Sequence, residues 1–160
     1  PLSRLEAIVP PDAVRMKELG RRLKLSRAEA DRLVGWALAE PVAAATSDAA
    51  FSRRLYRGDL RAIEDRLRLA FASARGRAAK DDGALVEAGS YSRLLGFLEK
   101  WRRPVFPITG QDLRELGLKQ GKALGSLLAE LESEWVESGF KPDRDALMAR
   151  AAEKISGSIP

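Results

Sequence analysis

The sequence predicts an all-α protein, a helical bundle in two packed subdomains with about seven helices and no sheet. Ala, Leu, Arg and Glu, which favour helices, dominate the chain. Alternating runs of Val, Ile and Thr, which are typical of half-buried strands, are absent. The 160 residues are 45% hydrophobic and 32% charged, a composition that supports a packed core.

Helix-start and helix-stop residues divide the first part of the chain. Residues 11–24 are predicted to form a helix. Ser26 and Glu29 then make an S-x-x-E capping box, which predicts a second helix that ends before Pro41. A third helix is expected over 46–58, with Ser or Asp caps at its start and a glycine at its end.

Two longer helices are predicted next, separated by a polar, glycine-bearing loop. Apolar residues recur every four positions over 59–75, which lines one helix face. Residues 76–83 are expected to form the loop, and residues 84–102 the second long helix.

The prolines at positions 104 and 107 predict a boundary, because proline cannot continue a helix. Residues 1–103 are therefore expected to form a helical body region, and 104–160 a helical tail subdomain. The helices predicted in the tail span residues 109–116, 120–138 and 142–155.

Two residue types are missing, and this limits the chemistry. Without Cys there can be no disulfide, thiolate nucleophile or Cys-ligated zinc. Without His the commonest general base and metal ligand are also lost. Any chemistry would therefore have to rest on Asp, Glu, Lys, Ser or Tyr. We predict no catalytic and no metal-binding residues in this chain.

No apolar run approaches the length of a membrane span, and no signal peptide is recognisable. These features predict a cytoplasmic protein that does not contact a membrane. The chain begins at Pro1 and not at Met, so it is expected to be a piece of a longer polypeptide.

The charge balance favours a polyanionic partner. Lys and Arg number 28 against 23 Asp and Glu, which gives a net charge of +5 and a pI near 9.8. Most of the positive charge is Arg, whose planar fork suits phosphate. Nucleic acid is the expected partner, and a general Ala/Arg compositional bias is the alternative explanation.

Four arginines form the first candidate site, Arg53, Arg54, Arg57 and Arg61. On a helix the first three share a face, and the fourth follows one turn later. Such a face could neutralise several phosphates along a nucleic-acid backbone. The alternative is a solvated face, since Asp and Glu residues lie close by in the sequence.

The second candidate is a glycine-rich turn between two predicted helices. It contains Gly117, Lys119, Gly121 and Lys122, with Gly125 beyond. Free backbone N–H groups at a helix start, close approach at glycine and two lysines would suit a phosphate. An ordinary glycine-capped turn explains the pattern equally well.

Residues 106–140 contain Phe106-Pro107, Gly110 with Asp112-Leu113, three glycines at four-residue steps (117, 121 and 125), and a Leu-rich helix leading to Trp135 and Phe140. This run resembles the C-terminal signature of bacterial class II CCA-adding tRNA nucleotidyltransferases, which are related to bacterial poly(A) polymerases. Residues 23–33 and 53–72 are similar to the helical body of the same family.

The resemblance implies that this chain is the C-terminal, tRNA-binding portion of such an enzyme. The parent protein would be a nucleotidyltransferase, CCA-adding or poly(A)-adding, and this chain alone would be non-catalytic. Mg²⁺ and CTP or ATP are expected only for the missing catalytic head, and this chain needs no cofactor of its own. The implied partners are tRNA, contacted through its backbone, and the protein's own N-terminal catalytic domain.

Two other readings stay open. The chain could be a helical interaction or dimerisation module, such as a homodimer, in which Phe51, Tyr56 and Phe97 would cluster at the surface. It could also be a free-standing enzyme that uses carboxylates. Residues 64–68 match E-D-x-x-R, which selects the incoming base in the family, but that motif belongs to its neck and so reads here as coincidence.

Overall fold

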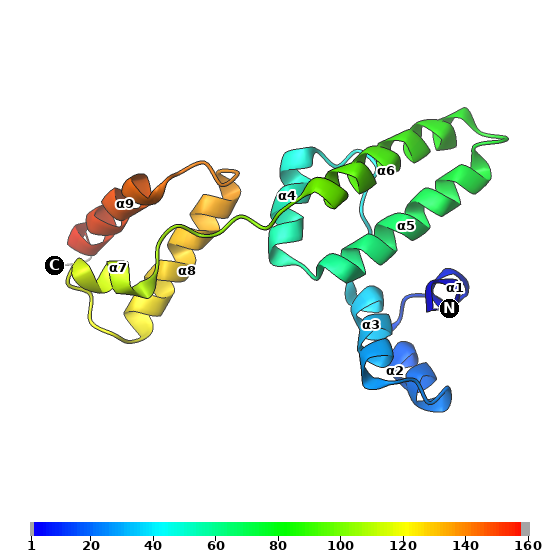
Figure 1. Cartoon of the computed structure of the whole chain (residues 1–160), viewed down its shortest axis with the longest axis horizontal. Coiled ribbons are helices and arrows are strands. Elements are labelled where there is room, and N and C mark those ends of the chain that lie inside the picture. Colours follow the sequence, from blue (N-terminus) through cyan, green and yellow to red (C-terminus); the bar gives the residue numbers. More distant parts are fainter. Residues whose placement is uncertain (1, 158–160) are drawn as a thin grey trace. The chain divides into compact units, whose positions relative to one another are not determined.

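The computed structural model describes residues 2–157, which form nine α-helices and no strand (Figure 1). The all-α prediction is confirmed, and α2 to α9 correspond to the eight segments predicted above, against an overall expectation of about seven helices. One helix, α1 (Leu2–Ile8), was not predicted at all. It has only seven residues and carries no acidic residue in its first turn and no basic residue in its last, so the usual end signals are missing.

The chain divides into two compact units after Arg102, and each is described by itself. The first unit contains α1 and five further helices, and its α5 and α6 lie side by side as a long hairpin (Figure 1). The second helix pairs with the third in the same way. The bounds of these five helices are α2 Ala13–Arg22, α3 Arg27–Leu38, α4 Asp48–Arg57, α5 Leu60–Arg77 and α6 Asp82–Lys100.

Polar side chains set the helix boundaries in the first unit. The Ser26–Glu29 capping box is present, because the Glu29 carboxylate accepts from the Ser26 N–H at 2.9 Å and the Ser26 hydroxyl accepts from the Glu29 N–H at 3.4 Å. Asp59 starts α5 by accepting from two backbone N–H groups. Asp81 does the same for α6, so the predicted loop at 76–83 is shorter, covering residues 78–81.

Two hydrophobic clusters form the core of the first unit. One joins α4, α5 and α6 and contains Val42, Phe51, Leu55, Ile63, Leu67 and Leu94. The other joins α1, α2 and α3 and contains Leu2, Met16, Leu33 and Trp36. Phe51 is fully buried, and its ring lies 5.9 Å from that of Phe97. The exposed aromatic cluster expected for an interaction module is therefore not formed by these two residues.

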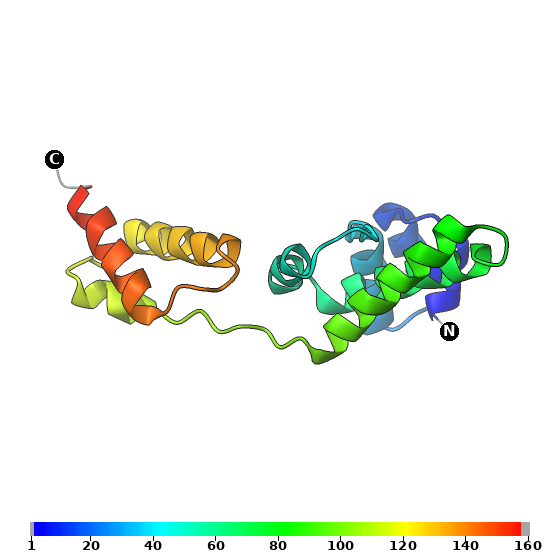
Figure 2. The same ribbon diagram turned by 90° about the horizontal axis from the view of Figure 1, so that it is seen from above.

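The second unit contains α7 (Gly110–Glu115), α8 (Lys122–Glu137) and α9 (Arg144–Gly157), which pack on one another (Figure 2). Trp135 lies at its centre, with ring centroids 5.3 Å from Phe106 and 5.0 Å from Phe140. The other buried apolar residues of this unit are Ile108, Leu113, Leu131, Val136, Leu147 and Ala151.

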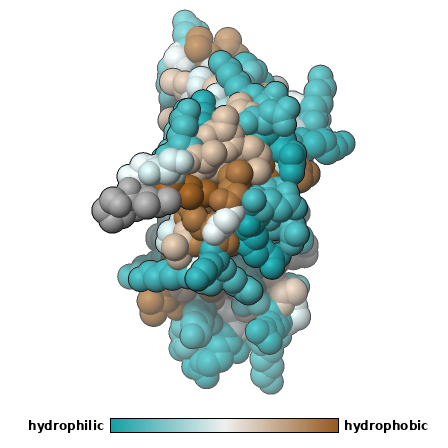
Figure 3. Space-filling model, turned by 90° about the vertical axis from the view of Figure 1, so that its left-hand side faces the viewer, coloured by the Kyte–Doolittle hydropathy of each residue, from teal (hydrophilic) through white to brown (hydrophobic). Residues whose placement is uncertain are grey.

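Several large hydrophobic residues are exposed, among them Ile8, Val14, Leu38 and Val105, which lie on different segments of the chain. Hydrophilic residues cover most of the face in Figure 3, where hydrophobic residues are visible in a central area and in smaller areas toward the top and the lower edge. No helix within residues 2–157 is both long enough and apolar enough to cross a membrane.

Asp112 ties α7 to α9 in the second unit. Its carboxylate accepts from the Thr109 N–H at 2.6 Å and the Thr109 hydroxyl at 2.8 Å. Arg144 donates to its other oxygen at 2.5 Å. The two Thr109 hydrogen bonds, and then Arg144, lower the pKa of Asp112 from 3.8 to about 2.

This lowered pKa predicts a pH dependence. A carboxylate with a depressed folded-state pKa stabilises the fold above its ordinary pKa, and that contribution is lost as the pH falls toward the folded value. Asp112→Asn should therefore lower the melting temperature of the second unit by several degrees at pH 6, and the difference from wild type should disappear between pH 4 and pH 2. Asp145→Asn, at an exposed position early in α9, is the control and should show little change. A constant difference across that pH range would contradict the assignment.

Candidate nucleic-acid interface

The two units differ in charge. Residues 1–102 contain 20 Lys and Arg against 14 Asp and Glu, a net charge of +6. Residues 103–160 contain 8 against 9, a net charge of −1. The whole positive excess of the chain therefore belongs to the first unit, where three of the predicted arginines lie on α4 and the fourth lies in the first turn of α5.

The α4 helix turns its apolar face to the core, and this sets the position of its arginines. Phe51 and Leu55 are fully buried, four residues apart. Arg53 and Arg54 are half-buried, and Arg57 in the last turn is exposed. Arg54 and Arg57 lie in the last turn, where their positive charge interacts favourably with the negative end of the helix dipole.

Arg54 makes backbone contacts within the fold. Its guanidinium donates to the carbonyl of Pro41 at 2.8 Å and to the carbonyl of Glu40. These carbonyls follow α3, where the chain turns toward α4. Arg54 therefore fixes the segment between α3 and α4, a role that the charge pattern did not predict.

Arg61 lies apart from Arg54. It is exposed in the first turn of α5 and lines a surface hollow of about 670 Å³ together with Arg32, Glu64 and Asp65. Arg54 lines a different hollow, beside Gly58 and Ile63. The four arginines therefore do not line one common hollow, and the one that holds Arg61 also contains carboxylates.

The turn between α7 and α8 needs glycine at two positions. Gly117 has φ +91° and follows the end of α7. Its N–H donates to the Arg114 carbonyl at 2.9 Å, and the Leu118 N–H donates to the Leu113 carbonyl at 3.2 Å. Gly121 has φ +152° and precedes α8, whose start has no side-chain cap. The first N–H groups of α8 are thus not occupied by a capping side chain.

Lysines flank this open helix start. Lys119 and Lys122 are exposed, and neither side chain makes a hydrogen bond or ion pair with the part of the chain that the structure describes. Gly125 is exposed in the first turn of α8, and nothing lies within 4 Å of the position that a Cβ would take there. A glycine within a helix lowers stability by about 1 kcal/mol relative to alanine. Close packing within the second unit does not explain the glycine at position 125.

The acidic motifs serve the fold. Glu64 pairs with Arg68 one turn away at 2.7 Å, and the buried Asp65 accepts two hydrogen bonds from Arg32. Asp143 accepts from the Ala146 N–H at 2.9 Å at the start of α9. Within residues 2–157, no group of three His, Cys, Asp or Glu residues is placed to hold a metal ion.

A buried ion cluster in the first unit was missed by the sequence analysis. Arg32 on α3 donates to both oxygens of Asp65 on α5 at 2.7 and 2.8 Å. Glu6 on α1 lies 3.9 Å from the same guanidinium. Burial first, and then the nearby Asp65, raise the pKa of Glu6. Glu6, Arg32 and Asp65 are far apart in the sequence, so no spacing pattern predicts the cluster.

No family model matches the chain. It is 38% identical to the mitochondrial CCA tRNA nucleotidyltransferase 1 of mouse (Mus musculus) and of human (Homo sapiens) over 56 residues, 35% of this chain and 13% of each relative. The zebrafish (Danio rerio) protein of the same name is 37% identical over 69 residues, 43% of this chain and 16% of its own length. The matched stretch thus spans less than a fifth of each relative.

The chain is therefore similar, over part of its length, to CCA-adding tRNA nucleotidyltransferases. The relatives found are animal mitochondrial proteins, so the similarity supports the CCA-adding family more broadly than the bacterial class expected from the sequence.

Proposed function

We propose that this chain is the tRNA-binding C-terminal portion of a CCA-adding nucleotidyltransferase. It would grip the backbone of the acceptor and T arms, while nucleotides are added by a catalytic head on another part of the polypeptide. The observation that carries the proposal is the 37–38% identity to CCA tRNA nucleotidyltransferases. We assign no catalytic step to this chain, and Mg²⁺ with CTP or ATP would belong to the head.

Two surfaces supply the proposed phosphate contacts. The first is the α4 surface, Arg53 and Arg57 on the positively charged first unit. The second is the α7–α8 turn, with Lys119, Lys122 and the uncapped start of α8. Arg54 and Arg61 belong to the same proposed set, but Arg54 already holds two carbonyls of the fold. Backbone contacts of this kind read the A-form shape of RNA and not its sequence.

Removing two arginines should weaken tRNA binding in a salt-dependent way. Each phosphate contact contributes close to one unit to the slope of log K against log salt concentration. Arg53→Ala with Arg57→Ala should therefore reduce that slope by about two and lower the affinity at 0.1 M salt at least about tenfold. The affinity is measured by filter binding or fluorescence anisotropy over a range of salt concentrations.

The matched control is Arg21→Ala with Arg22→Ala, which removes the same charge from α2, where both residues pair with Glu18. Lys119→Ala with Lys122→Ala tests the α7–α8 turn in the same assay. If the α4 variant and the α7–α8 variant both retain the wild-type slope, or if the Arg21/Arg22 control loses as much as they do, the assigned surfaces are wrong. If the wild-type chain does not bind tRNA at any salt concentration, the proposed function fails.

A further inference from the structure

Glu6 is a buried carboxyl group that neither proposed RNA surface uses. It lies in α1, which packs against α3 and α5, and its side chain is completely buried. Within residues 2–157, four buried side-chain polar atoms lack a hydrogen-bond partner, and two of them are the Glu6 carboxylate oxygens. Burial without hydrogen bonds disfavours the charged form of a carboxyl group, because the charge loses its hydration.

Glu6 competes with Asp65 for a single guanidinium. Arg32 donates to both oxygens of Asp65, at 2.7 and 2.8 Å. Glu6 lies 3.9 Å from the Nε of Arg32, which is too far for a hydrogen bond. Asp65 therefore holds the cation, and an ionised Glu6 would keep a negative charge inside the fold without a bonded partner.

The charged groups that surround Glu6 make α1 bind a proton more tightly when it is docked than when it is in water. Burial first, and then the nearby Asp65, raise the pKa of Glu6 above its ordinary value of 4.5. Three positive charges oppose this rise without cancelling it, those of Arg32 on α3, Arg61 on α5 and the amino terminus of the chain. The two arginines stay charged at every pH at which a carboxyl group titrates.

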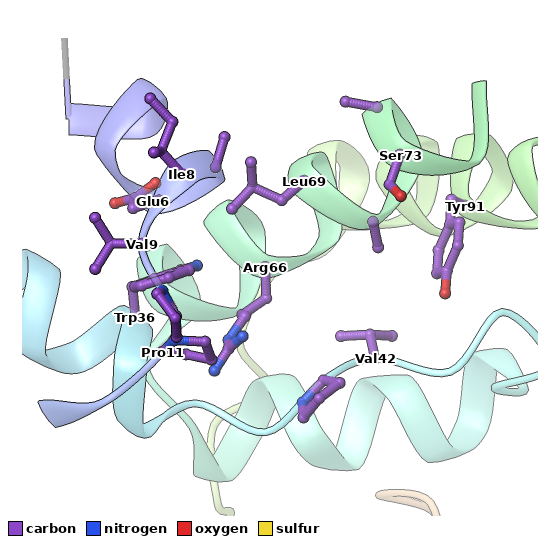
Figure 4. Close-up of a pocket in the computed structure, with 15 residues that line it drawn as sticks. Glu6, Ile8, Val9, Pro11, Trp36, Val42, Arg66, Leu69, Ser73 and Tyr91 are labelled. Atoms are coloured by element: carbon purple, nitrogen blue, oxygen red, sulfur yellow. The ribbon is translucent and has the colours of Figure 1, made fainter. Parts of the chain in front are cut away.

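The docked position of α1 depends on packing. The helix has seven residues, with no acidic residue in its first turn and no basic residue in its last, and a helix of this length is not stable in water by itself. Leu2 and Leu5 join the core cluster that contains Trp36, whereas Ile8 is 79% exposed. Figure 4 shows Glu6 and Ile8 of α1 close to Trp36 of α3.

We propose that the docking of α1 is a pH-dependent switch, in which α1 packs on α3 and α5 with Glu6 protonated and is released when the Glu6 carboxyl group gives up its proton to water. Release would hydrate the carboxylate and open the core cluster that contains Leu33 and Trp36. This switch goes beyond the tRNA contacts proposed above and does not depend on them.

The direction of the switch follows from proton binding by the two states. Below the ordinary pKa of 4.5 both the docked and the released α1 hold the proton, so the docking equilibrium does not change with pH. Above that value the released state loses its proton first, because only the docked state has the raised pKa. Rising pH therefore favours release, until the docked Glu6 has also lost its proton.

Amide hydrogen exchange in α1 tests the switch. Exchange is followed by NMR on the ¹⁵N-labelled chain between pH 4.5 and pH 7, below the range in which an amino terminus loses its charge, and is corrected for the intrinsic effect of pH. The Val9 N–H donates to the Leu5 carbonyl at 2.9 Å, and its protection should fall as the pH rises. The fall is limited to about tenfold per pH unit, because one proton is released.

Two further signals accompany this measurement. The indole N–H of Trp36 is buried without a hydrogen-bond partner, so its exchange reports the entry of water beneath α1 and should speed up in parallel. The Trp36 signal is assigned from Trp36→Phe. The protection of amides in α8 should stay constant, because α8 belongs to the second unit and does not contact Glu6.

Glu6→Gln replaces the carboxyl group by a neutral amide of nearly the same shape. It should remove the pH dependence and raise the protection of α1 at pH 7 to about the wild-type value at pH 4.5. Glu6→Leu, also neutral, should remove the dependence as well. Glu18→Gln is the matched control, since the exposed Glu18 pairs with Arg21 and Arg22 on α2, and it should keep the wild-type dependence. Circular dichroism checks that each variant folds.

Three results would overturn the proposal. The first is a protection of wild-type α1 that does not change between pH 4.5 and pH 7. The second is a pH dependence that persists in both Glu6 variants. The third is equal protection in α1 and α5, which would mean that α1 opens only when the whole first unit unfolds.

Discussion

Replacing Arg32 by leucine is expected to destabilise the first unit by about 3–5 kcal/mol, the range found when one partner of a buried ion pair is removed. Arg32 is 22% exposed and bonds both oxygens of Asp65, whose side chain is 7% exposed. The completely buried Glu6 carboxylate depends on the same guanidinium. Without Arg32, two buried carboxylates would face each other with no cation bonded to them.

Chemical denaturation, followed by amide hydrogen exchange in α3 and α5, measures this loss. Arg27→Leu is the matched control on the same helix, because Arg27 pairs at 3.8 Å with the exposed Asp31 and should contribute less than about 0.5 kcal/mol. The Arg32→Leu defect should also shrink as the pH falls, since burial already raises the pKa of Glu6 and protonation of this carboxyl would relieve the repulsion.

A triple variant separates lost charge compensation from lost packing. Glu6→Leu, Arg32→Leu and Asp65→Leu together remove every charge of the cluster and should recover most of the stability, because an apolar replacement of a buried ion cluster is often neutral. If Arg32→Leu unfolds no more easily than Arg27→Leu, the buried cluster does not stabilise the unit.

Much of the fold was predictable because local residues determine it. The capping box at Ser26 and the aspartate at position 59 begin helices where the sequence places them, since a cap acts within one helical turn. The short α1 carries no such signal, and it is held by packing of Leu2 against residues of α2 and α3. Burial of this kind depends on tertiary contacts that a local pattern does not contain.

The same distinction between local and tertiary determinants applies to the candidate sites. The backbone of the α7–α8 turn was predictable, because positive φ angles at 117 and 121 favour glycine. The role of Arg54 was not predictable, since the carbonyls that accept its hydrogen bonds lie 13 and 14 residues away in the sequence. The buried cluster of Glu6, Arg32 and Asp65 comes from three different helices, so only the folded chain brings these residues together.

Replacing Trp135 by alanine is expected to unfold the second unit. Trp135 is 3% exposed, contacts the rings of Phe106 and Phe140, and donates to the Pro142 carbonyl at 3.1 Å. Truncation of a buried Trp costs about 3–5 kcal/mol. A unit of this size has a total free energy of unfolding of only about 3–9 kcal/mol at the usual ~0.05–0.15 kcal/mol per residue. The loss caused by Trp135→Ala therefore approaches the total stability of the unit.

In the NMR spectrum, Trp135→Ala should move the signals of residues 103–157 to random-coil positions, whereas those of the first unit should stay, because its two core clusters contain no residue of the second. Trp135→Phe is the control. It keeps an aromatic ring in the centre but loses the hydrogen bond to Pro142, so it should cost about 1–2 kcal/mol and remain folded. If Trp135→Ala retained a native spectrum for the second unit, the aromatic cluster would not be what holds α7, α8 and α9 together. Unfolding would also remove the α7–α8 turn, so the same variant measures how much tRNA affinity the first unit provides through α4 alone.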